Sequence, residues 1–323
     1  MAPLLEIRDL KIEFETEEGV ITAIDGVDLH LAEGETLGLV GESGCGKSVT
    51  CHSILRLTPP NGRVVSGEIL FAGVDILALD ERAMGKVRGR DIAMIFQDPL
   101  TSLNPVHQIG RQLAESLKLH RSMSHNQAVR EAVALLDRVG IPDSKSRFKE
   151  YPHQLSGGMN QRVMIAMALA CRPKLIIADE PTTALDVTIQ AQILDLLKEL
   201  KEDIGMALML VTHDLGVVAE MADSVAVMYL GRVVEEGPVA RIFESAVHPY
   251  THGLMQSIPR VDLNVPRLTP IDGSVPPPLD LPSGCYFRPR CPNVLDRCAT
   301  APPPLEPLGA GHAAACYNPV KAP

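Results

Sequence analysis

The fold of this chain is decided by the stretch Gly41-Glu42-Ser43-Gly44-Cys45-Gly46-Lys47-Ser48. It fits the pattern G-x-x-x-x-G-K-[ST], whose glycines let backbone N–H groups turn inward around phosphate groups. In this pattern the lysine reaches the β- and γ-phosphate oxygens, and the serine binds magnesium. We therefore predict a phosphate-binding loop that runs from Gly41 to Val49.

The sequence on either side of this loop fits the same interpretation. Residues 36–41 form a short apolar run that suits a buried parallel strand, and residues 47–57 can form a helix. The positive end of that helix dipole would face the phosphates. Because strand, loop and helix follow one another in this order, a glycine-rich turn that binds nothing is a weak alternative.

A second apolar strand, residues 175–178, leads directly into Asp179 and Glu180. Since side chains alternate along a strand, we expect the two carboxylates to diverge. We assign Asp179 to the magnesium shell, and Glu180 to orienting or deprotonating the attacking water. Two carboxylates merely solvated at a strand end are a weak alternative, because the strand reads as buried and Pro181 follows at once.

A second glycine-rich segment lies between these two motifs. It reads Leu155-Ser156-Gly157-Gly158-Met159 and stands before an apolar run at 163–171 that predicts a helix. A serine and two glycines before a helix predict a second anion-binding helix start. One globular domain has little use for two such sites unless the second serves another nucleotide.

With these segments in this order, the chain resembles the ATP-binding cassette (ABC) family over about residues 4–240. The loop at 41–48 matches the family's Walker A motif, 155–159 its signature segment and 175–180 its Walker B motif. Met159 departs from the glutamine that many relatives carry. The resemblance implies an α/β fold, with a P-loop NTPase (RecA-like) core, an antiparallel β subdomain and a helical insert.

The resemblance also implies roles for residues outside these motifs. Gln97 matches the Q-loop residue that touches magnesium and couples to the membrane subunits, so the implied Mg²⁺ ligands are Ser48, Gln97 and Asp179. His213 matches the switch histidine near the γ-phosphate, and Ala184-Leu185-Asp186 matches the D-loop. Phe14 stands where the family places a ring under adenine, although an aromatic residue on an alternating strand is usually part of the core.

Charge and composition exclude several classes of protein. The net charge of −10 over 323 residues disfavours a nucleic-acid surface, which needs clustered positive charge. No run approaches the roughly 18 apolar residues of a spanning helix, and early charges such as Glu6 and Arg8 argue against a secretory leader. We expect a cytosolic protein, in which seven cysteines are not structural disulfides.

The hydrophobic pattern divides the chain into a nucleotide-binding domain at 1–245 and a proline-rich C-terminal extension at 246–323. We place the helical subdomain at about 98–172. The extension is too poor in apolar runs to hold a core unaided. Further expected elements are antiparallel strands over 4–39, a helix capped by Ser124, a helix from Asp186 to Gly205, and a hairpin over 224–237 that turns near Gly231.

The extension narrows the substrate class. The tetrapeptide at 248–251, His-Pro-Tyr-Thr, and the segment 98–105 resemble the dipeptide and oligopeptide importer ATPases, a branch that also contains nickel importers. We therefore expect an ATPase subunit that powers peptide uptake, on family analogy rather than site chemistry. A nickel or other solute importer and the ATPase of a soluble enzyme complex stay open, whereas an ATPase acting on DNA or ribosomes is disfavoured.

The resemblance further implies the partners. Two cassettes pair head to tail, with Mg²⁺ and ATP held between the Walker A motif of one and the signature of the other. The peptide branch usually uses two different ATPases, which favours a heterodimer. Two transmembrane permeases, and indirectly an extracytoplasmic solute-binding protein, complete the expected complex. In this complex the chain would be a peripheral protein at the cytoplasmic face of the cell membrane. We expect no nucleic acid among its partners.

Four of the seven cysteines gather near the C-terminus, with five, six and seventeen residues between successive ones: Cys285, Cys291, Cys298 and Cys316. Such clustering in a core-poor segment suggests a metal staple. Four thiolates suit zinc or an iron–sulfur cluster, and the spacing is wider than the short pairs of structural zinc. We favour a [4Fe–4S] cluster, which the resemblance also implies; zinc and free thiols stay open. Cys51 and Cys171 are expected to pack within helices.

Overall fold

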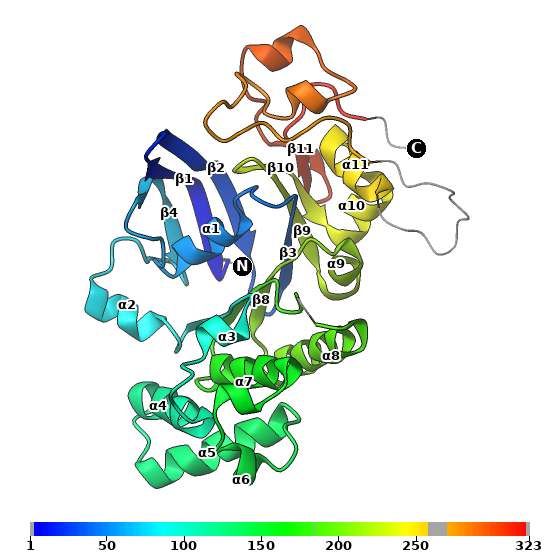
Figure 1. The fold of residues 1–323 in the computed structure, drawn as a ribbon. Helices are drawn as coiled ribbons and strands as arrows, with labels where there is room; N and C mark the ends of the chain where they lie inside the picture. Colours follow the sequence, from blue (N-terminus) through cyan, green and yellow to red (C-terminus); the bar gives the residue numbers. More distant parts are fainter. Residues whose placement is uncertain (1–2, 184, 258–269, 321–323) are drawn as a thin grey trace. The chain divides into compact units, whose positions relative to one another are not determined.

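The computed structural model describes residues 3–183, 185–257 and 270–320. The chain divides into two compact units (Figure 1). The first comprises Met1–Leu31, Thr36–Leu77 and Thr212–Pro323, and the second comprises Ala32–Glu35 and Ala78–Val211. The C-terminal extension therefore belongs to the same compact unit as the Gly41–Ser48 loop.

The first unit contains an antiparallel sheet with the strand order β2-β1-β4-β5. Buried positions alternate along β1 at Leu5 and Ile7, and again at Leu10 and Ile12 after a shift in register, which explains why this segment forms a half-buried strand. Of the antiparallel strands predicted for residues 4–39, the two within residues 5–31 are confirmed, whereas residues 36–39 belong to a strand that pairs in parallel with residues 224–227. The strands are β1 (Leu5–Thr16), β2 (Gly19–Leu31), β4 (Gly62–Phe71) and β5 (Val74–Asp75).

A second set of strands in this unit runs in the order β11-β12-β10-β9-β3. Only β3 and β9 are parallel, and β3 is buried along its whole length, as the apolar run predicted. The predicted hairpin joins β9 to β10 and turns at Leu230 and Gly231, which both have positive φ. The strands are β3 (Thr36–Val40), β9 (Ser224–Tyr229), β10 (Arg232–Pro238), β11 (Glu306–Gly309) and β12 (His312–Ala314).

The helices of the first unit are α1 (Lys47–Ile54), α9 (Leu215–Met221), α10 (Val239–Ser245) and α11 (Pro249–Gln256). Beyond residue 270 the extension is largely irregular, with short 3₁₀ helices at Arg288–Arg290 and Asp296–Ala299. It contributes Phe287 to a core cluster that also holds Tyr229, Ile242 and Tyr250. The part of the extension beyond residue 270 is thus ordered by packing onto β9, α10 and α11, as expected of a segment without enough apolar residues of its own.

The second unit contains three strands in the order β6-β7-β8, and both pairs are parallel. Every residue of these strands is buried, which is typical of parallel strands covered on both faces. The strands are β6 (Ile92–Ile95), β7 (Leu175–Asp179) and β8 (Ala207–Val211). Since parallel strands place their carboxyl ends at one edge, residues that follow them gather there.

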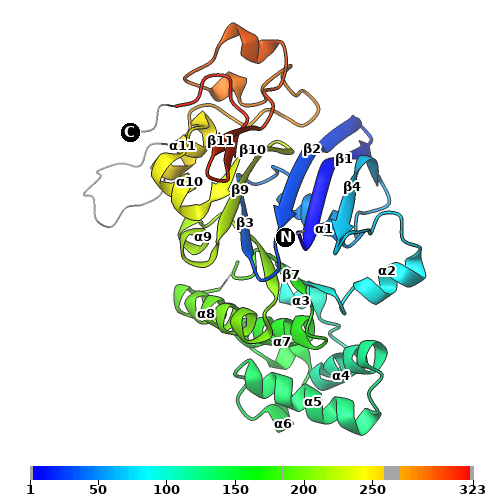
Figure 2. The same cartoon turned by 180° about the vertical axis from the view of Figure 1, so that it is seen from behind.

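The helices of the second unit include a group formed by α4, α5 and α7, which contact one another (Figure 2). The predicted caps are confirmed: Ser124 precedes α5, and Asp186 accepts a 3.0 Å hydrogen bond from the Ile189 N–H at the start of α8. Gly205 ends α8 with a left-handed backbone. The helices are α2 (Glu81–Val87), α3 (Pro99–Ser102), α4 (Ile109–Arg121), α5 (His125–Arg138), α6 (Ser144–Arg147), α7 (Gly157–Leu169) and α8 (Val187–Ile204).

Within the described residues, no helix is both long and apolar enough to cross a membrane.

Candidate nucleotide-binding site

The predicted phosphate-binding loop joins β3 to α1, as the sequence indicated. Its first glycine is required by close packing as well as by its φ of 149°. A Cβ atom at Gly41 would lie 2.2 Å from the carbonyl oxygen of Met228, so no larger residue fits. The last loop glycine, Gly46, has a φ of 104° and precedes α1, whose first-turn N–H groups point back into the loop.

Lys47 lies inside this loop, with only 6% of its surface exposed. Its Nζ donates hydrogen bonds to the carbonyl oxygen of Gly41 at 2.7 Å and to that of Glu42 at 3.1 Å. Backbone carbonyls thus hold the ammonium group, and no carboxylate neutralises it in any ion pair of the described residues. A full positive charge beside the N-terminus of α1 attracts a polyanion such as a triphosphate.

The opposite side of the loop is held by residues that the sequence analysis missed. The N–H of Glu42 donates to the Tyr250 hydroxyl at 2.9 Å, and the Glu42 carboxylate pairs with Arg290. Both partners belong to the C-terminal extension. The tetrapeptide at 248–251 was noticed only as a family resemblance, and nothing in the pattern around Arg290 indicated a contact with the loop.

In the second unit, Glu180 directly follows β7 and adopts a left-handed backbone with a φ of 48°. One of its carboxylate oxygens, Oε2, accepts hydrogen bonds from Gln97 Nε2 and from Thr183 Oγ1, both at 2.9 Å. The structure thus brings together two predicted site residues, Gln97 and Glu180, and adds Thr183, which the sequence analysis missed. Two donors on one oxygen fix the direction of the carboxylate.

Asp179 is the last residue of β7 and is 4% exposed, whereas Glu180 is partly exposed. The two residues thus differ in exposure, and the divergence of their carboxylates toward different roles stays a prediction. Alternation along a strand does not separate them, because the strand ends at Asp179. The left-handed turn at Glu180 redirects the chain, and its N–H still donates to the carbonyl oxygen of Val211 at 2.9 Å.

The signature segment forms the start of α7 rather than a loop before it. The helix begins at Gly157, six residues earlier than predicted, and Ser156 is its N-cap residue. The Ser156 Oγ accepts the Met159 N–H at 3.3 Å, while Leu155 precedes the cap. Gly158 is required by packing, because a Cβ atom there would approach Ile189 Cγ2 to 2.9 Å. The exposed Ser156 and Gly157 therefore form the tip of a capped helix start.

The remaining predicted site residues occupy varied environments. His213 is exposed after β8, and Asp186 is exposed at the start of α8. Leu185 is partly buried, and Ala184 lies outside the described residues. Phe14 on β1 is partly buried and lies close against Gly62 of β4, where an added Cβ atom would come within 2.6 Å of the ring.

The cysteines of the first motifs are packing residues. Cys51 is fully buried within α1, as predicted, and burial raises the pKa of Cys45. The prediction that Cys171 lies within a helix is wrong, because α7 ends at Leu169 and Cys171 follows in a turn. No disulfide joins any pair, because all seven cysteines are free.

The four C-terminal cysteines share one neighbourhood of the extension. The Cys285 N–H donates to the Cys298 carbonyl at 2.8 Å. Burial raises the pKa of Cys316 to about 11, with smaller contributions from the charges of the other three thiols. Nevertheless, the described residues contain no group of three or more His, Cys, Asp or Glu side chains placed to hold a metal ion. The arrangement therefore does not support the predicted [4Fe–4S] cluster, or zinc in its place.

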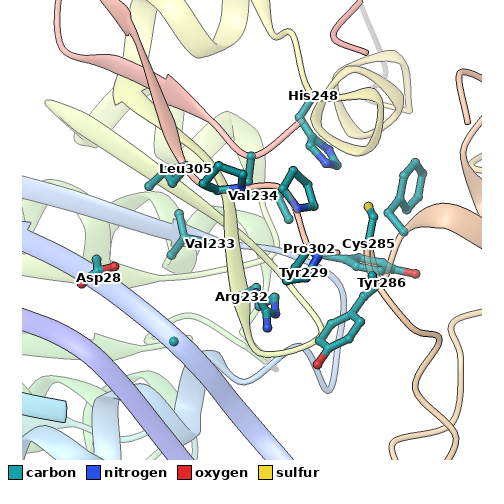
Figure 3. A pocket seen from close by; sticks show the side chains of 16 residues that line it. Asp28, Tyr229, Arg232, Val233, Val234, His248, Cys285, Tyr286, Pro302 and Leu305 are labelled. Atoms are coloured by element: carbon teal, nitrogen blue, oxygen red, sulfur yellow. The ribbon is translucent and has the colours of Figure 1, made fainter. Parts of the chain in front are cut away.

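A cavity of about 370 Å³ lies between β10 and the extension (Figure 3). Among the predicted site residues only Cys285 lines it, and the segment Pro302–Leu305 forms an apolar wall. His248 also lines it and is almost completely buried. Its Nδ1 accepts the N–H of Tyr250 at 3.1 Å, which makes His248 the N-cap of α11.

Burial lowers the pKa of His248 from 6.5 to about 3, which gives a testable dependence of stability on pH. Between these values the unfolded chain binds a proton that the folded chain does not, so acid favours unfolding. This contribution to stability is complete above pH 6.5 and is lost as the pH falls toward 3, with a slope of up to about 1.4 kcal/mol per pH unit. We expect His248→Asn, whose Oδ1 can still cap α11, to flatten that part of the curve.

Thermal unfolding of the two proteins between pH 7 and pH 4 measures this effect. The difference between the curves isolates His248, because other groups such as the buried Glu235 and its partner His312 are present in both proteins. Curves that stay parallel over the whole range would show that His248 is not the group that titrates.

Two sequence families match the chain. The family described as ABC transporter matches residues 24–183, a range that contains the loop at 41–49, Gln97, the signature segment and Glu180. The family described as "Oligopeptide/dipeptide transporter, C-terminal region" matches residues 234–298. The second match includes Tyr250 and Arg290, the two residues of the extension that contact Glu42.

Curated relatives match over nearly the whole length. The oligopeptide transport ATP-binding protein OppD of Salmonella typhimurium is 51% identical over 98% of this chain and 94% of its own length. OppD of Escherichia coli is 50% identical with the same coverage. A probable peptide ABC transporter ATP-binding protein of Sinorhizobium fredii is 53% identical over 98% of this chain and 95% of its own length.

Solved structures show a similar fold. A dimeric ATP-binding cassette, MJ0796, in a post-hydrolysis state with ADP and Pi has a TM-score of 0.66. It is 30% identical, and the alignment covers 73% of this chain and 98% of that chain. CbiO1 of Clostridium perfringens, part of an ABC transporter complex, has a TM-score of 0.64 and 27% identity, covering 75% of this chain and 91% of its own.

Proposed function

Because the chain belongs to the ABC transporter ATP-binding proteins, in their oligopeptide and dipeptide branch, we propose that it hydrolyses ATP to power peptide uptake through partner permeases. The observation that carries this function is the identity of 51% to OppD over 98% of the chain, with the C-terminal region included. The three relatives described above are all named for peptide transport. This favours peptides over nickel and over a soluble enzyme complex.

The P-loop binds the triphosphate of ATP in this proposal. Lys47 contacts the β and γ oxygens, and the N–H groups from Gly44 to Val49 surround the phosphates. Phe14 stacks under the adenine ring, for which its partly exposed ring is suited. The buried Lys47, whose Nζ donates to two backbone carbonyls and to the sulfur of Cys45, supports this assignment.

Magnesium fits the donor set of Ser48, Gln97 and Asp179, because hydroxyl, amide and carboxylate oxygens are the ligands that this hard cation prefers. When bound, it neutralises charge that develops on the transferred phosphoryl group. Glu180 orients or deprotonates the attacking water, and His213 contacts the γ-phosphate. The two hydrogen bonds on Oε2 of Glu180 support its role, since phosphoryl transfer depends on positioning.

The signature segment serves the nucleotide of a second cassette. Exposed Ser156 and Gly157, at the capped start of α7, offer N–H groups and a helix dipole to a phosphate from outside the chain. Asp186, in the D-loop, is also exposed, at the start of α8. The dimeric state of the similar cassette MJ0796 supports such pairing.

Closure of this dimer is the step that does mechanical work. Moving an equilibrium from 1:99 to 99:1 requires about 5.5 kcal/mol of differential affinity, which signature contacts made only in the closed state can supply. Loss of the γ-phosphate removes those contacts, and the dimer reopens. Gln97 connects this cycle to the permeases at the cytoplasmic face of the membrane.

Purification of the tagged full-length chain in mild detergent tests this function. We expect two hydrophobic permeases and a second, different ATPase to accompany it, with ATPase activity in the purified complex. A soluble enzyme complex without permeases would contradict the transport function. A complex containing two copies of this chain would contradict the heterodimer alone. The domain boundary at residue 245 also stays a proposal.

For the four C-terminal cysteines we keep a [4Fe–4S] cluster only as a proposal. The thiol donor set and the electrostatic interaction of the four groups support it. The positions of the side chains do not, because the described residues contain no group of three or more placed to hold a metal ion. Anaerobic purification followed by iron, sulfide and zinc analysis decides the matter. Four irons with four sulfides support the cluster, one zinc supports the alternative, and neither metal means free thiols.

A further inference from the structure

Glu42 is the only acidic residue of the P-loop, and the C-terminal extension binds its carboxylate. Arg290 Nη1 lies 2.7 Å from Glu42 Oε2, and Arg290 Nη2 lies 3.1 Å from Oε1. This is a bidentate pair, the strongest and most directional geometry of a carboxylate with a guanidinium. The arginine side chain is 4% exposed and the glutamate side chain 30% exposed. The pair is therefore largely withdrawn from water, where ion pairs are screened least.

Arg290 is itself held from several directions. Its Nε donates to the carbonyl oxygen of Asp272 at 3.1 Å, and its guanidinium carbon lies 5.8 Å from the ring centres of both Tyr229 and Phe287. The hydrogen bond to Glu42 is the largest cause of the raised pKa of Arg290, so the group stays charged. Contacts with the extension and with β9 thus orient the guanidinium of Arg290 independently of its contact with Glu42.

The backbone of Glu42 is held as firmly as its side chain. Its N–H donates to the hydroxyl of the fully buried Tyr250 at 2.9 Å, and its carbonyl oxygen accepts from Lys47 Nζ at 3.1 Å. A continuous series of contacts therefore leads from Arg290 and Tyr250, through one residue, to the lysine that we assign to the phosphates.

We propose that Arg290 and Tyr250 are positioning residues for ATP binding: they couple the C-terminal extension to the P-loop through Glu42. The inference rests on the proposed function, since it assumes that the loop binds ATP. Arg290 acts in two ways. It fixes the loop conformation, and it neutralises a carboxylate that would otherwise repel a triphosphate held by the same loop.

This coupling is reciprocal. If docking of the extension raises the affinity for ATP, then ATP must stabilise the docked extension by the same factor. The extension is thus a second site at which nucleotide affinity can be changed.

Calorimetric titration of the full-length chain with Mg–ATP tests the proposal. We expect Arg290→Gln to weaken binding about tenfold, a typical magnitude for coupling between two sites. The double variant Glu42→Gln/Arg290→Gln should recover the part of this loss that comes from the unpaired carboxylate, and the part that remains measures the loop-fixing role. Arg288→Gln is the matched control: Arg288 lies in the same 3₁₀ turn, its side chain donates a 3.4 Å hydrogen bond to Ser283, and the variant should bind ATP as the wild type does.

Hydrogen exchange of the segment 283–300, with and without Mg–ATP, provides a readout that a purely structural role would not move. ATP should slow exchange of this segment in the wild type and in Arg288→Gln, but much less in Arg290→Gln. Tyr250→Phe, which removes only the acceptor of the Glu42 N–H, should give an intermediate result in both measurements.

Two outcomes overturn the coupling: wild-type affinity in Arg290→Gln, or exchange of segment 283–300 that ATP slows equally in the wild type and in Arg290→Gln. A double variant as weak as Arg290→Gln would overturn the charge-neutralising role and support the loop-fixing role. Thermal unfolding of each variant shows that it is folded, and the double variant keeps the test decisive if Arg290→Gln alone is unstable. A wild-type protein that does not bind Mg–ATP would instead overturn the proposed function, so the two failures are distinguishable.

Discussion

Glu180→Gln is expected to bind ATP as tightly as the wild type, to lose roughly 100-fold or more of its turnover, and to accumulate as a closed, ATP-loaded dimer. The amide oxygen of glutamine can still accept the hydrogen bonds from Gln97 and Thr183, so the position of the side chain is kept. What is lost is the negative charge that polarises water. Steady-state phosphate release and size-exclusion chromatography with Mg–ATP measure the two effects.

The matched control for this variant is Glu199→Gln, which changes the same residue type on the exposed side of α8. It should hydrolyse ATP at the wild-type rate and stay in the wild-type oligomeric state. A Glu180→Gln protein that turned over normally would remove this carboxylate from the mechanism, whatever its effect on dimerisation.

Lys47→Ala has the second large effect, at an earlier step. Removing a buried ammonium that contacts the phosphates loses a charged hydrogen bond worth about 1.5–3 kcal/mol. Calorimetry should therefore show ATP binding that is about 10- to 100-fold weaker. The carbonyls of Gly41 and Glu42 also lose the donor that now joins them, which loosens the loop.

Lys198→Ala on the exposed face of α8 is the control for Lys47→Ala, and its affinity for ATP should not change. Unchanged affinity in Lys47→Ala would contradict the assignment of the P-loop. Together, the two variants separate binding from hydrolysis: Lys47→Ala should not form the closed dimer even at low hydrolysis rates, whereas Glu180→Gln should.

Local chemistry made much of this molecule predictable. The Gly41–Ser48 loop, the cap at Asp186, the left-handed end at Gly205 and the hairpin at Gly231 each depend on residues within a few positions of one another. Such features follow from the conformational freedom of glycine and from short side-chain acceptors. The match to a P-loop cassette could therefore be predicted before any contact was known.

The start of α7 and the geometry of Glu180 were predicted less well, for identifiable reasons. The apolar run at 163–171 defined the predicted helix, so Gly157 and Gly158 were placed before it. The helix nevertheless begins at Gly157, because the Ser156 hydroxyl caps its first turn. Gly158 is needed in this turn because Ile189 leaves no room for a side chain there. The left-handed backbone of Glu180 is unusual for a residue with a Cβ atom, and no sequence pattern announces it.

The contacts of Tyr250 and Arg290 with Glu42 could not be predicted, because the three residues are far apart in the chain. Tyr250 lies 208 positions from Glu42, and Arg290 lies 248 positions from it. No periodicity or motif relates residues at such separations; only the packing of Phe287 and Tyr250 against Tyr229 brings them together. The four cysteines show the converse, since clustering in sequence predicted a ligand set that the described residues do not form.

One short contact in the second unit relates the two nucleotides of a dimer. The side-chain amide of Gln161, in the first turns of α7, donates to the carbonyl oxygen of Pro181, the residue after Glu180. This hydrogen bond connects the start of α7, which we assign to the partner's ATP, to the segment of Glu180, which we assign to the protein's own ATP. If these assignments hold, we expect a tilt of α7 at one site to shift the carboxylate at the other, which would couple the two hydrolysis events of a transport cycle.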